Sequence, residues 1–413
     1  MMGVAEMKKG WQTKKLGDVC AFDKAQGIHY GLPYVGLEQI ESHTARFIGP
    51  NEPQPVKSST FRFSDEHVLY GRLRPYLNKA LKPDFEGHCS TEIFPIKPHP
   101  ELSREYLLYW LLADETCDRI NATCTGARMP RADMNKVLSF EFPLPPLPEQ
   151  RQIIRILDEA FDGLARATAN AEQNLRNARA LFESHLQSVF TQRGEGWVEK
   201  SVKEIAAPAK GSIRTGPFGS QLLHSEFVDE GIAVLGIDNA VANEFRWGKN
   251  RFIAPEKYRQ LERYTVHPGD VLITIMGTCG RCAIVPDNIP TAINTKHICC
   301  ITLDQKQCLP GYLHSYFLHS PQSKEYLFKH AKGAIMAGLN MGLIQELPVM
   351  LPPVKAQAAI VQTANDLRAE TQRLESIYQQ KLAALGELKK SLLHQAFNGE
   401  LTEDNGQLSK DKG

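Results

Sequence analysis

An internal duplication is the feature that most constrains how this chain can fold. The two copies match at a constant separation of 207 residues over a long stretch of sequence. The matching pairs are Gly126-Ala127-Arg128-Met129 with Gly333-Ala334-Ile335-Met336, Asp133-Met134 with Asn340-Met341, Leu144-Pro145-Pro146-Leu147 with Leu351-Pro352-Pro353-Val354, Gln150 with Gln357, Ile153-Ile154 with Ile360-Val361, and Leu181, Ser184 and Phe190 with Leu388, Ser391 and Phe397. A repeat of this length predicts two copies of one structural unit.

The match continues upstream at smaller separations. Trp11 with residues 16–19 corresponds to Trp197 with residues 202–205, Val68-Leu69 to Val271-Leu272, and Ser90-Thr91 to Asn294-Thr295. The second copy has therefore gained about twenty residues, and insertions of this kind accumulate in surface loops. Each copy consists of a globular domain, a proline-rich joint and a long polar-apolar segment.

The long segments are predicted to be helices of coiled-coil type. Apolar residues recur at alternating steps of four and three, the spacing of a coiled-coil seam. The seam positions are Ile153, Leu157, Ala160, Leu164, Ala167, Ala171, Asn174, Ala178 and Leu181 in the first copy, and Ile360, Ala364, Leu367, Thr371, Leu374, Tyr378, Lys381, Leu385, Leu388 and Leu392 in the second. Each helix of about forty residues would be ~60 Å long. A pseudo-twofold repeat predicts that the two helices pair as an antiparallel coiled coil.

Two features of the seam leave room for a further partner. Asn174, Thr371 and Lys381 interrupt it, and apolar residues spill beyond it at Ile154, Ile156, Phe161 and Phe182. Polar seam positions control register in some coiled coils, whereas surplus apolar residues favour a surface for another protein. We expect some of each.

Proline-rich leaders precede both helices, at residues 142–148 and 347–353. Proline fixes its own backbone and disfavours helix in the residue before it. The leaders should therefore be extended and set the angle between globule and helix.

The globular domains are predicted to be α+β. Strands are expected at residues 34–37, 68–70 and 93–96 in the first and 233–237, 271–276 and 298–303 in the second. Helices are expected at equivalent places, residues 105–112 and 312–318.

The polar loops between these strands are the candidate DNA surface. Arginine can contact guanine edges in two places, asparagine and glutamine can contact adenine, and lysine neutralises phosphate. The net charge of the chain is only +1, so positive charge must be local or supplied by a partner. The candidate DNA-binding residues are Arg72, Arg74, Tyr76, Asn78, Lys79, Arg128 and Arg131 in the first domain, and Arg214, Ser220, Gln221, Arg246, Lys249, Arg251, Thr278 and Lys296 in the second.

The cysteines predict reduced thiols and no metal site. Their number, nine, is odd, which argues against a disulfide framework. Cys279 and Cys282 form one CxxC, with His297, Cys299 and Cys300 downstream. Zinc usually takes two such pairs, and adjacent cysteines on a strand point to opposite faces. We favour buried thiols in a strand-rich core. No apolar run is long enough to span a membrane and the N-terminus lacks the apolar core of a signal peptide, so we expect a cytoplasmic protein.

In these motifs the chain resembles the specificity subunits of type I restriction-modification enzymes. The resemblance covers nearly the whole chain and keeps the motif order in both halves. It rests on residues 69–79, 90–92, 129–131 and 143–151 in the first half, and 216–220, 268–274, 277–280 and 351–353 in the second. One departure is Val354-Lys355-Ala356-Gln357, where the family usually has Glu before Gln.

The resemblance implies two target recognition domains that each read one half of a split DNA site. They would occupy residues 1–147 and 194–353, with helical spacers at 148–193 and 354–400 and a polar tail at 401–413. The spacers would dock two methyltransferase subunits, and two motor-nuclease subunits would complete the restriction enzyme. S-adenosylmethionine would bind the methyltransferase and ATP the motor, so no cofactor is expected on this chain.

The sequence does not support the two alternative classes, a free-standing enzyme and a coiled-coil scaffold. An adenine methyltransferase needs an Asn/Asp-Pro-Pro-aromatic loop to hold a flipped base, a motor needs a GxxxxGK[ST] phosphate loop, and neither occurs. Pro83-Asp84 with Glu86 and Glu92 superficially resembles a nuclease cluster, but no suitably spaced Glu-x-Lys follows. A pure coiled-coil scaffold would not need two domains with elaborate polar loops.

Overall fold

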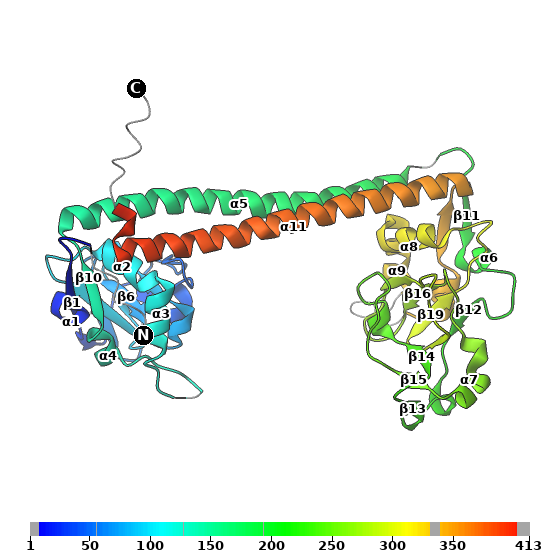
Figure 1. The fold of residues 1–413 in the computed structure, drawn as a ribbon, viewed down its shortest axis with the longest axis horizontal. Coiled ribbons are helices and arrows are strands. Elements are labelled where there is room, and N and C mark those ends of the chain that lie inside the picture. The colour runs from blue at the N-terminus through cyan, green and yellow to red at the C-terminus, as the bar shows by residue number, and fades with distance from the viewer. Residues whose placement is uncertain (1–7, 55, 127, 193, 331–338, 403–413) are drawn as a thin grey trace. The chain divides into compact units, whose positions relative to one another are not determined.

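A computed structural model of the chain describes residues 8–54, 56–126, 128–192, 194–330 and 339–402. It forms two compact units, Met1–Glu172 with Gln379–Gly413 and Gln173–Tyr378. Each unit holds one globule together with the adjoining part of both long helices, α5 (Leu147–Thr191) and α11 (Val354–Asn398) (Figure 1). The second member of one repeat match, residues 333–336, lies outside the described residues.

The first globule mixes short strands and helices, as the sequence predicts. Its strands are β1 (Gln12–Lys15), β2 (Cys20–Phe22), β3 (Gln26–Gly27), β4 (Tyr34–Val35), β5 (Thr60–Phe63), β6 (Val68–Gly71), β7 (Ala80–Leu81), β8 (Gly87–Cys89), β9 (Ile93–Pro98) and β10 (Glu141–Leu144). Its helices are α1 (Leu16–Val19), α2 (Arg104–Leu112), α3 (Asp114–Asn121) and α4 (Met134–Leu138).

The second globule repeats this order with one additional helix, α7. Its strands are β11 (Val198–Ser201), β12 (Ile213–Thr215), β13 (Phe227–Val228), β14 (Ile232–Leu235), β15 (Phe252–Ile253), β16 (Val271–Thr274), β17 (Cys282–Ile284), β18 (Ala292–Asn294), β19 (Ile298–Ile301) and β20 (Pro348–Leu351). Its helices are α6 (Val202–Ile205), α7 (Pro255–Leu261), α8 (Pro310–His319), α9 (Pro321–His330) and α10 (Met341–Gln345).

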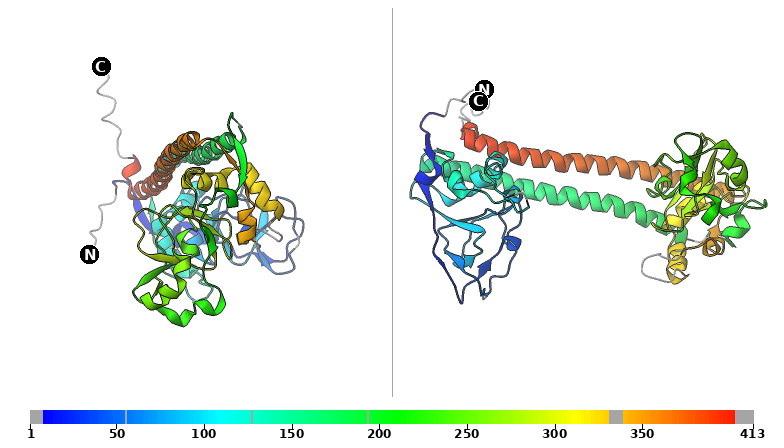
Figure 2. Two further views of the ribbon diagram at one scale, coloured as in Figure 1. Left: turned by 90° about the vertical axis from the view of Figure 1, so that its right-hand side faces the viewer. Right: turned by 90° about the horizontal axis from the view of Figure 1, so that it is seen from below.

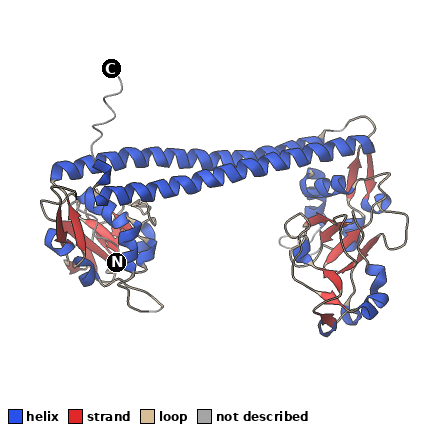
Figure 3. Cartoon of the chain, viewed as in Figure 1, coloured by secondary structure: helices blue, strands red, loops and turns tan. Residues whose placement is uncertain are grey.

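Each globule contains two four-stranded sheets and a two-stranded one (Figure 3). The antiparallel sheet β2-β9-β6-β7 has the same order as β12-β19-β16-β17. The second four-stranded sheet of each globule contains one parallel pair of strands, β4 with β8 in the first globule and β14 with β18 in the second. These two sheets differ at the third strand, because β5 pairs with β8 whereas β15 pairs with β14, on the opposite side of the pair.

The proline-rich leaders become edge strands. β10 pairs with β1, placing Pro143 opposite Thr13, and β20 pairs with β11. A two-stranded sheet tolerates proline because one side of each strand needs no partner. The extended conformation predicted for the leaders is therefore present, and it ties the start of each globule to the start of its helix.

The two long helices pair antiparallel within each unit. In the first unit, Ile153 and Leu157 near the start of α5 share a core with Leu393 and Ala396 near the end of α11. In the second, Leu186 and Phe190 near the end of α5 share a core with Ala364 on α11. Figure 2 shows α5 and α11 side by side within each unit. This confirms the predicted antiparallel pairing of the two helices.

The predicted seam is wrong at two positions in the second half of each helix, whereas Ala178 is buried and Leu385 partly buried as predicted. Leu181 and Leu388 are 67% and 49% exposed, and the seam positions Asn174 and Lys381 are exposed as well. The more buried residues are their next neighbours, Leu175 and Phe182 on α5 and Leu382 and Lys389 on α11. A straight helix has 3.6 residues per turn, so its buried stripe drifts away from a strict seven-residue repeat.

The two joints are held by the same hydrogen bonds. Gln150 is fully buried and accepts from the Ser103 amide at 2.8 Å, while its Nε2 donates to the carbonyls of Glu101 and Pro145, both at 2.9 Å. Its repeat partner is equally buried and makes equivalent bonds. Gln357 accepts from the Leu309 amide at 2.9 Å and donates to the carbonyls of Gln307 at 2.8 Å and Pro352 at 2.9 Å.

Glu149 differs from its repeat partner, Ala356, because it binds both ends of the chain. Its Oε1 lies 2.8 Å from Lys8 Nζ and accepts from Thr402 Oγ1 at 2.7 Å. Lys8 Nζ also donates to Thr402 Oγ1 at 2.6 Å.

Two global properties complete the description. No helix among the described residues has the length and apolar character needed to cross a membrane. Within the same part of the chain, no group of three or more histidine, cysteine or acidic side chains is arranged to hold a metal. Cys282, Cys299 and Cys300 are buried.

Candidate nucleic-acid interface

Three loops of the first globule form one platform around Glu92. Its carboxylate accepts from Arg72 Nε at 3.1 Å and from Arg131 Nε at 2.9 Å. Burial disfavours the charged carboxylate, but the hydrogen bonds from Arg131 and Arg72 outweigh it and hold the pKa of Glu92 below its ordinary value. The Arg72 guanidinium also lies 5.4 Å from the centre of the Phe94 ring. The two arginines are thereby fixed in place while remaining partly exposed.

Backbone contacts join the same loops. The amide of Arg74 donates to the Pro130 carbonyl at 2.8 Å, and the amide of Ala132 donates to the Arg72 carbonyl at 2.9 Å. Arg74, in the left-handed region with φ of 51°, starts the short 3-10 turn Pro75–Leu77. The chain is thus bent so that residues 72–76 and 128–131 are presented together.

Three side chains of this platform are available to a ligand. Arg74 and Arg128 are exposed, and Tyr76 is 49% exposed. Within the described part of the chain, no intramolecular hydrogen bond or ion pair involves these three side chains. An exposed cation without an intramolecular partner can bind an anionic ligand without first breaking an ion pair.

Two predicted residues of the first globule point inward. Asn78 is fully buried and its Nδ2 donates to the Leu112 carbonyl at 3.2 Å. Lys79 Nζ donates to the carbonyls of Leu37 at 2.6 Å and Ile40 at 2.8 Å. Both side chains hold the loops together, so we remove them from the candidate DNA-binding set.

In the second globule, four loops meet around residues 294–297. The Gly216 amide donates to the Thr295 carbonyl at 3.3 Å, the Thr295 amide to the Leu235 carbonyl at 2.9 Å, and the Ile275 amide to the His297 carbonyl at 2.9 Å. Gly216 packs so tightly that a Cβ there would lie 1.9 Å from the Asn294 carbonyl oxygen. The glycine in the turn 216–220 is therefore required for this close approach.

Asp238 organises the longest of these loops. Its Oδ1 lies 2.5 Å from an Arg251 guanidinium nitrogen, and its Oδ2 accepts from the Lys249 amide at 2.6 Å. Burial disfavours the Asp238 carboxylate, but these hydrogen bonds outweigh it and hold its pKa below its ordinary value. The pKa of His297 is lowered by burial and by the positive charges of Lys296 and Arg251, so each of these cations lies near His297.

Most predicted residues of the second globule lie on these loops. Ser220, Gln221, Lys249 and Thr278 are exposed, and Lys296 and Arg251 are partly exposed. Gln221 also accepts from the Tyr264 hydroxyl at 3.0 Å. Arg246 forms an ion pair with Glu244 and lines a cavity of about 400 Å³ together with Phe182 and Arg368 of the long helices. Arg246 therefore lies beside the long helices, in a cavity that Lys296 and Thr278 do not line.

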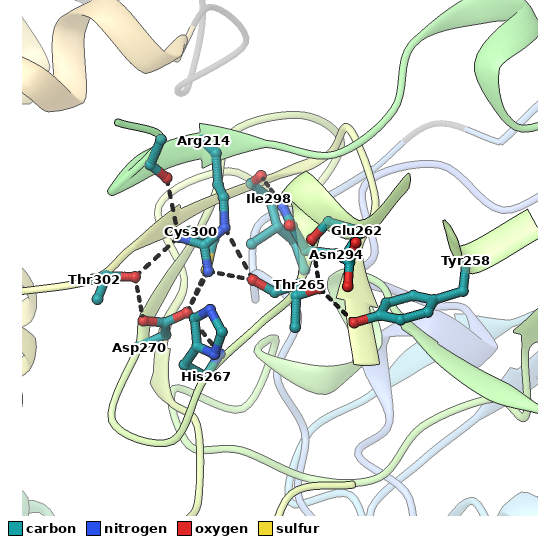
Figure 4. A network of polar contacts seen from close by, with 11 residues as sticks. Arg214, Tyr258, Glu262, Thr265, His267, Asp270, Asn294, Ile298, Cys300 and Thr302 are labelled. Carbon is teal, nitrogen blue, oxygen red and sulfur yellow. Dashed lines mark hydrogen bonds and ion pairs between the residues drawn. The ribbon is translucent and has the colours of Figure 1, made fainter. Parts of the chain in front are cut away.

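Arg214 is the third predicted residue that points inward. Its guanidinium lies 2.5 Å from Asp270, donates to Thr302 Oγ1 at 2.9 Å and donates to the Thr265 carbonyl (Figure 4). Asp270 is 1% exposed and also accepts from Thr302 and the His267 amide. This buried ion pair joins β12 to the loop before β16, and we remove Arg214 from the candidate set.

Trp247 is a candidate that the sequence interpretation missed. It is 60% exposed and packs edge-on against Phe245, with ring centres 5.4 Å apart. The loop that carries it is fixed by two bonds between Asn239 and Arg246. The signal was the alternation of aromatic and basic residues in Phe245-Arg246-Trp247-Gly248-Lys249, a pattern typical of surfaces that stack on nucleic-acid bases.

Comparison with known proteins places these features in one family. Residues 8–175 and 231–382 match the family described as type I restriction modification DNA specificity domain. The chain is 26% identical over 300 residues to the type I restriction enzyme EcoBI specificity subunit of Escherichia coli, a match covering 68% of this chain and 63% of that protein. The chain thus spans under two thirds of the length of this relative.

Solved structures share the fold. A chain from a structure that describes complex assembly and conformational transition of a type I R-M system has a TM-score of 0.79 and 21% identity, covering 96% of this chain and all of that one. The HsdS subunit from Thermoanaerobacter tengcongensis has a TM-score of 0.64 and 21% identity, covering 96% of this chain and 98% of that one.

Proposed function

Because the chain belongs to the family of type I restriction-modification DNA specificity domains, we propose that it is the DNA-recognition subunit of a type I restriction-modification enzyme. Each globule reads one half of a split double-stranded site. The chain itself is non-catalytic and acts in the cytoplasm, where it positions the subunits that methylate adenine or cut DNA.

The observation that carries this proposal is that one loop platform is built twice. In both globules the loop after the first strand of the parallel pair, β4 or β14, begins with a glycine amide that donates to a side-chain oxygen: Gly36 to Gln39 and Gly236 to Asn239, both at 2.8 Å. In both, the residue after the second strand of the pair donates its amide hydrogen to the carbonyl at the end of the first strand. These bonds join Ser90 to Val35 at 3.0 Å and Thr295 to Leu235 at 2.9 Å. The same frame thus carries a different set of exposed side chains in each globule.

The side chains on each platform suit DNA in different ways. Arg74, Arg128 and Tyr76 of the first globule combine cations with an aromatic ring, and Arg72 and Arg131 add positive charge held by a single carboxylate. The second globule offers Ser220, Gln221, Lys249, Arg251, Thr278, Lys296 and Trp247. Arginine and glutamine read base edges, lysine and hydroxyl groups bind phosphate, and aromatic rings stack on bases.

The long helices supply the docking sites for the other subunits. Leu181 and Leu388 are repeat partners, and both are exposed although the sequence predicted them in the seam between the helices. Two equivalent apolar positions on two equivalent helices fit two copies of the same methyltransferase subunit. Two motor-nuclease subunits complete the assembly, S-adenosylmethionine and ATP being bound by these partners.

Adenine methylation sequencing tests the proposal. Cells that express this chain with its methyltransferase should methylate adenine in one split sequence, and the chain alone should transfer no methyl group. Replacing residues 201–345 with another recognition domain should change one block of that sequence and leave the other unchanged. Methyl transfer by the isolated chain, or a change in both blocks, would contradict the proposal.

A further inference from the structure

Lys389 is a partly buried cation without an acidic partner. It lies on α11 in the first unit, where its Nζ donates to the His43 carbonyl at 3.0 Å and lies 5.4 Å from the centre of the Phe161 ring. In the part of the chain that the structure describes, no carboxylate forms an ion pair with it. Burial lowers the pKa of the Lys389 ammonium, against the opposing attraction of Asp114. Burying a cation against neutral groups costs free energy, so packing alone gives no reason for a lysine here.

The second copy keeps the contact between a cation and an aromatic ring at this place, but with the two positions exchanged. The repeat partner of Lys389 is Phe182, and the repeat partner of Phe161 is Arg368. Arg368 lies 6.0 Å from the centre of the Phe182 ring. Each unit therefore has one cation and one ring, with the positions exchanged. What Lys389 adds in the first unit is its hydrogen bond to the globule.

The residue that receives this bond is connected directly to a candidate recognition loop. His43 is in the left-handed region with φ of 63°, a strained conformation for a residue other than glycine. Its amide donates to the Asn78 carbonyl at 3.0 Å. Asn78, also left-handed with φ of 39°, ends the turn that carries Arg74 and Tyr76.

Lys79 adds a second connection between the same loops. Its two bonds to the carbonyls of Leu37 and Ile40 attach the end of loop 72–79 to the start of loop 37–46. A continuous path of hydrogen bonds thus runs from α11 through Lys389, His43 and Asn78 to the loop that presents Arg74. Every contact in this path lies within the first unit.

We propose that Lys389 is a positioning residue for the first half-site: its bond to the His43 carbonyl couples α11 to loop 72–79, so recognition by the first globule depends on it. The proposal rests on the proposed function, in which this loop reads DNA. Recognition by the second globule does not depend on Lys389, since the equivalent position there is a phenylalanine. Restraining a recognition loop in its bound conformation increases affinity by lowering the entropy lost on binding.

The test uses the full chain assembled with its methyltransferase subunits. Lys389→Met keeps the length of the side chain and removes its donor, Lys389→Arg restores a donor, and Lys390→Gln is the matched control at the exposed neighbouring lysine. Binding is measured on the split site and on sites substituted in one block, with the blocks assigned by the exchange of residues 201–345.

Lys389→Met should weaken binding to the intact site roughly 5- to 10-fold. It should also reduce the penalty for substituting the first block and leave the penalty for the second unchanged. Lys389→Arg should recover most of the affinity, and Lys390→Gln should resemble the unaltered chain. Equal effects on both blocks, or no difference between Lys389→Met and Lys390→Gln, would overturn the inference.

Hydrogen exchange on the free full chain gives a readout that does not require DNA. In Lys389→Met, the His43 amide should exchange faster, while the Asn243 amide in the corresponding loop of the second globule should not change. Unchanged protection at His43 overturns the inference. If the unaltered complex methylates no split site, the proposed function fails, whereas the exchange result still tests the coupling.

Discussion

Arg214 shows why single residues were hard to place from sequence. It stands immediately before the glycine-punctuated polar turn 215–221, a context in which arginine commonly faces a ligand. The Arg214 side chain points inward because it binds Asp270, which lies 56 residues later in the chain. The sheet brings the two residues together, since β19 pairs with both β12 and β16. Asn78 and Lys79 were misassigned for the same reason, because their side chains donate hydrogen bonds to carbonyl groups of residues distant in the sequence. Arg74, Arg128, Ser220 and Thr278 are exposed and, among the described residues, have no such partner side chain across the sheets, so they stay candidates.

Removing Arg214 should damage stability. Arg214→Ala leaves Asp270 buried without its cation, and breaking one side of a buried ion pair costs about 3–5 kcal/mol. Urea denaturation followed by circular dichroism measures this loss. The exposed ion pair Arg373 with Glu370 provides the control, because Arg373→Ala should change stability by less than ~1 kcal/mol. Similar losses for the two variants would contradict the structural role of Arg214.

Arg74 should behave in the opposite way. Arg74→Ala removes an exposed side chain, so the melting temperature should stay unchanged. If this guanidinium contacts a base edge, affinity for the split site should fall by ~1–3 kcal/mol with relaxed preference at one position of the first block. Fluorescence anisotropy with singly substituted DNAs measures both. An unaltered affinity would assign Arg74 to the solvated surface.

Trp247 should affect the other block. Base–aromatic stacking contributes ~1–3 kcal/mol when tested by alanine substitution, so Trp247→Ala should weaken binding by that amount and Trp247→Phe by less. The effect should be insensitive to salt, unlike that of Lys249→Ala, because no phosphate charge is neutralised. Titrations at several salt concentrations distinguish the two, and equal salt slopes for the alanine variants of Trp247 and of Lys249 would contradict stacking.

Among the elements, the long helices were predicted well and their buried faces only in part. The seam holds from Ile153 to Ala171 and from Ile360 to Tyr378, and beyond these ranges two of its positions in each copy give way to their next neighbours. A heptad pattern alone cannot decide between Leu181 and Phe182, because both residues are apolar. The sheets show a similar limit. Three strands of each globule, β4, β6 and β9 in the first and β14, β16 and β19 in the second, were located from local sequence. The strand with which β5 or β15 pairs depends on contacts between distant residues.

The exposed leucines give a prediction for the helices. Leu181→Glu and Leu388→Glu should each leave the fold intact and remove one of the two proposed methyltransferase subunits, and the double variant should remove both. Native mass spectrometry of the assembled complex measures the stoichiometry. Gln187→Glu adds the same charge at another exposed position of α5 and should retain both subunits. Full assembly by the double variant would show that docking occurs elsewhere.

For the whole molecule, the length of the helices should determine the spacing of the two blocks. Inserting seven residues into both α5 and α11 at repeat-equivalent positions lengthens each helix by ~10 Å, which corresponds to about three base pairs of DNA. The unread gap in the methylated sequence should grow by that amount, with both blocks unchanged. Methylation sequencing measures the gap, and an active variant with an unaltered gap would show that the helices do not set the spacing.

The paired glutamines at the joints have a consequence for how such chains can change over generations. Gln150 and Gln357 hold their globules only through backbone amides and carbonyls, and every residue supplies these groups except for the missing amide of proline. A globule with quite different side chains can therefore form the same hydrogen bonds at either joint. Genetic recombination that exchanges one globule for a distant relative would keep these bonds, so under the proposed function a host could acquire a new DNA target in a single event while keeping the rest of its enzyme.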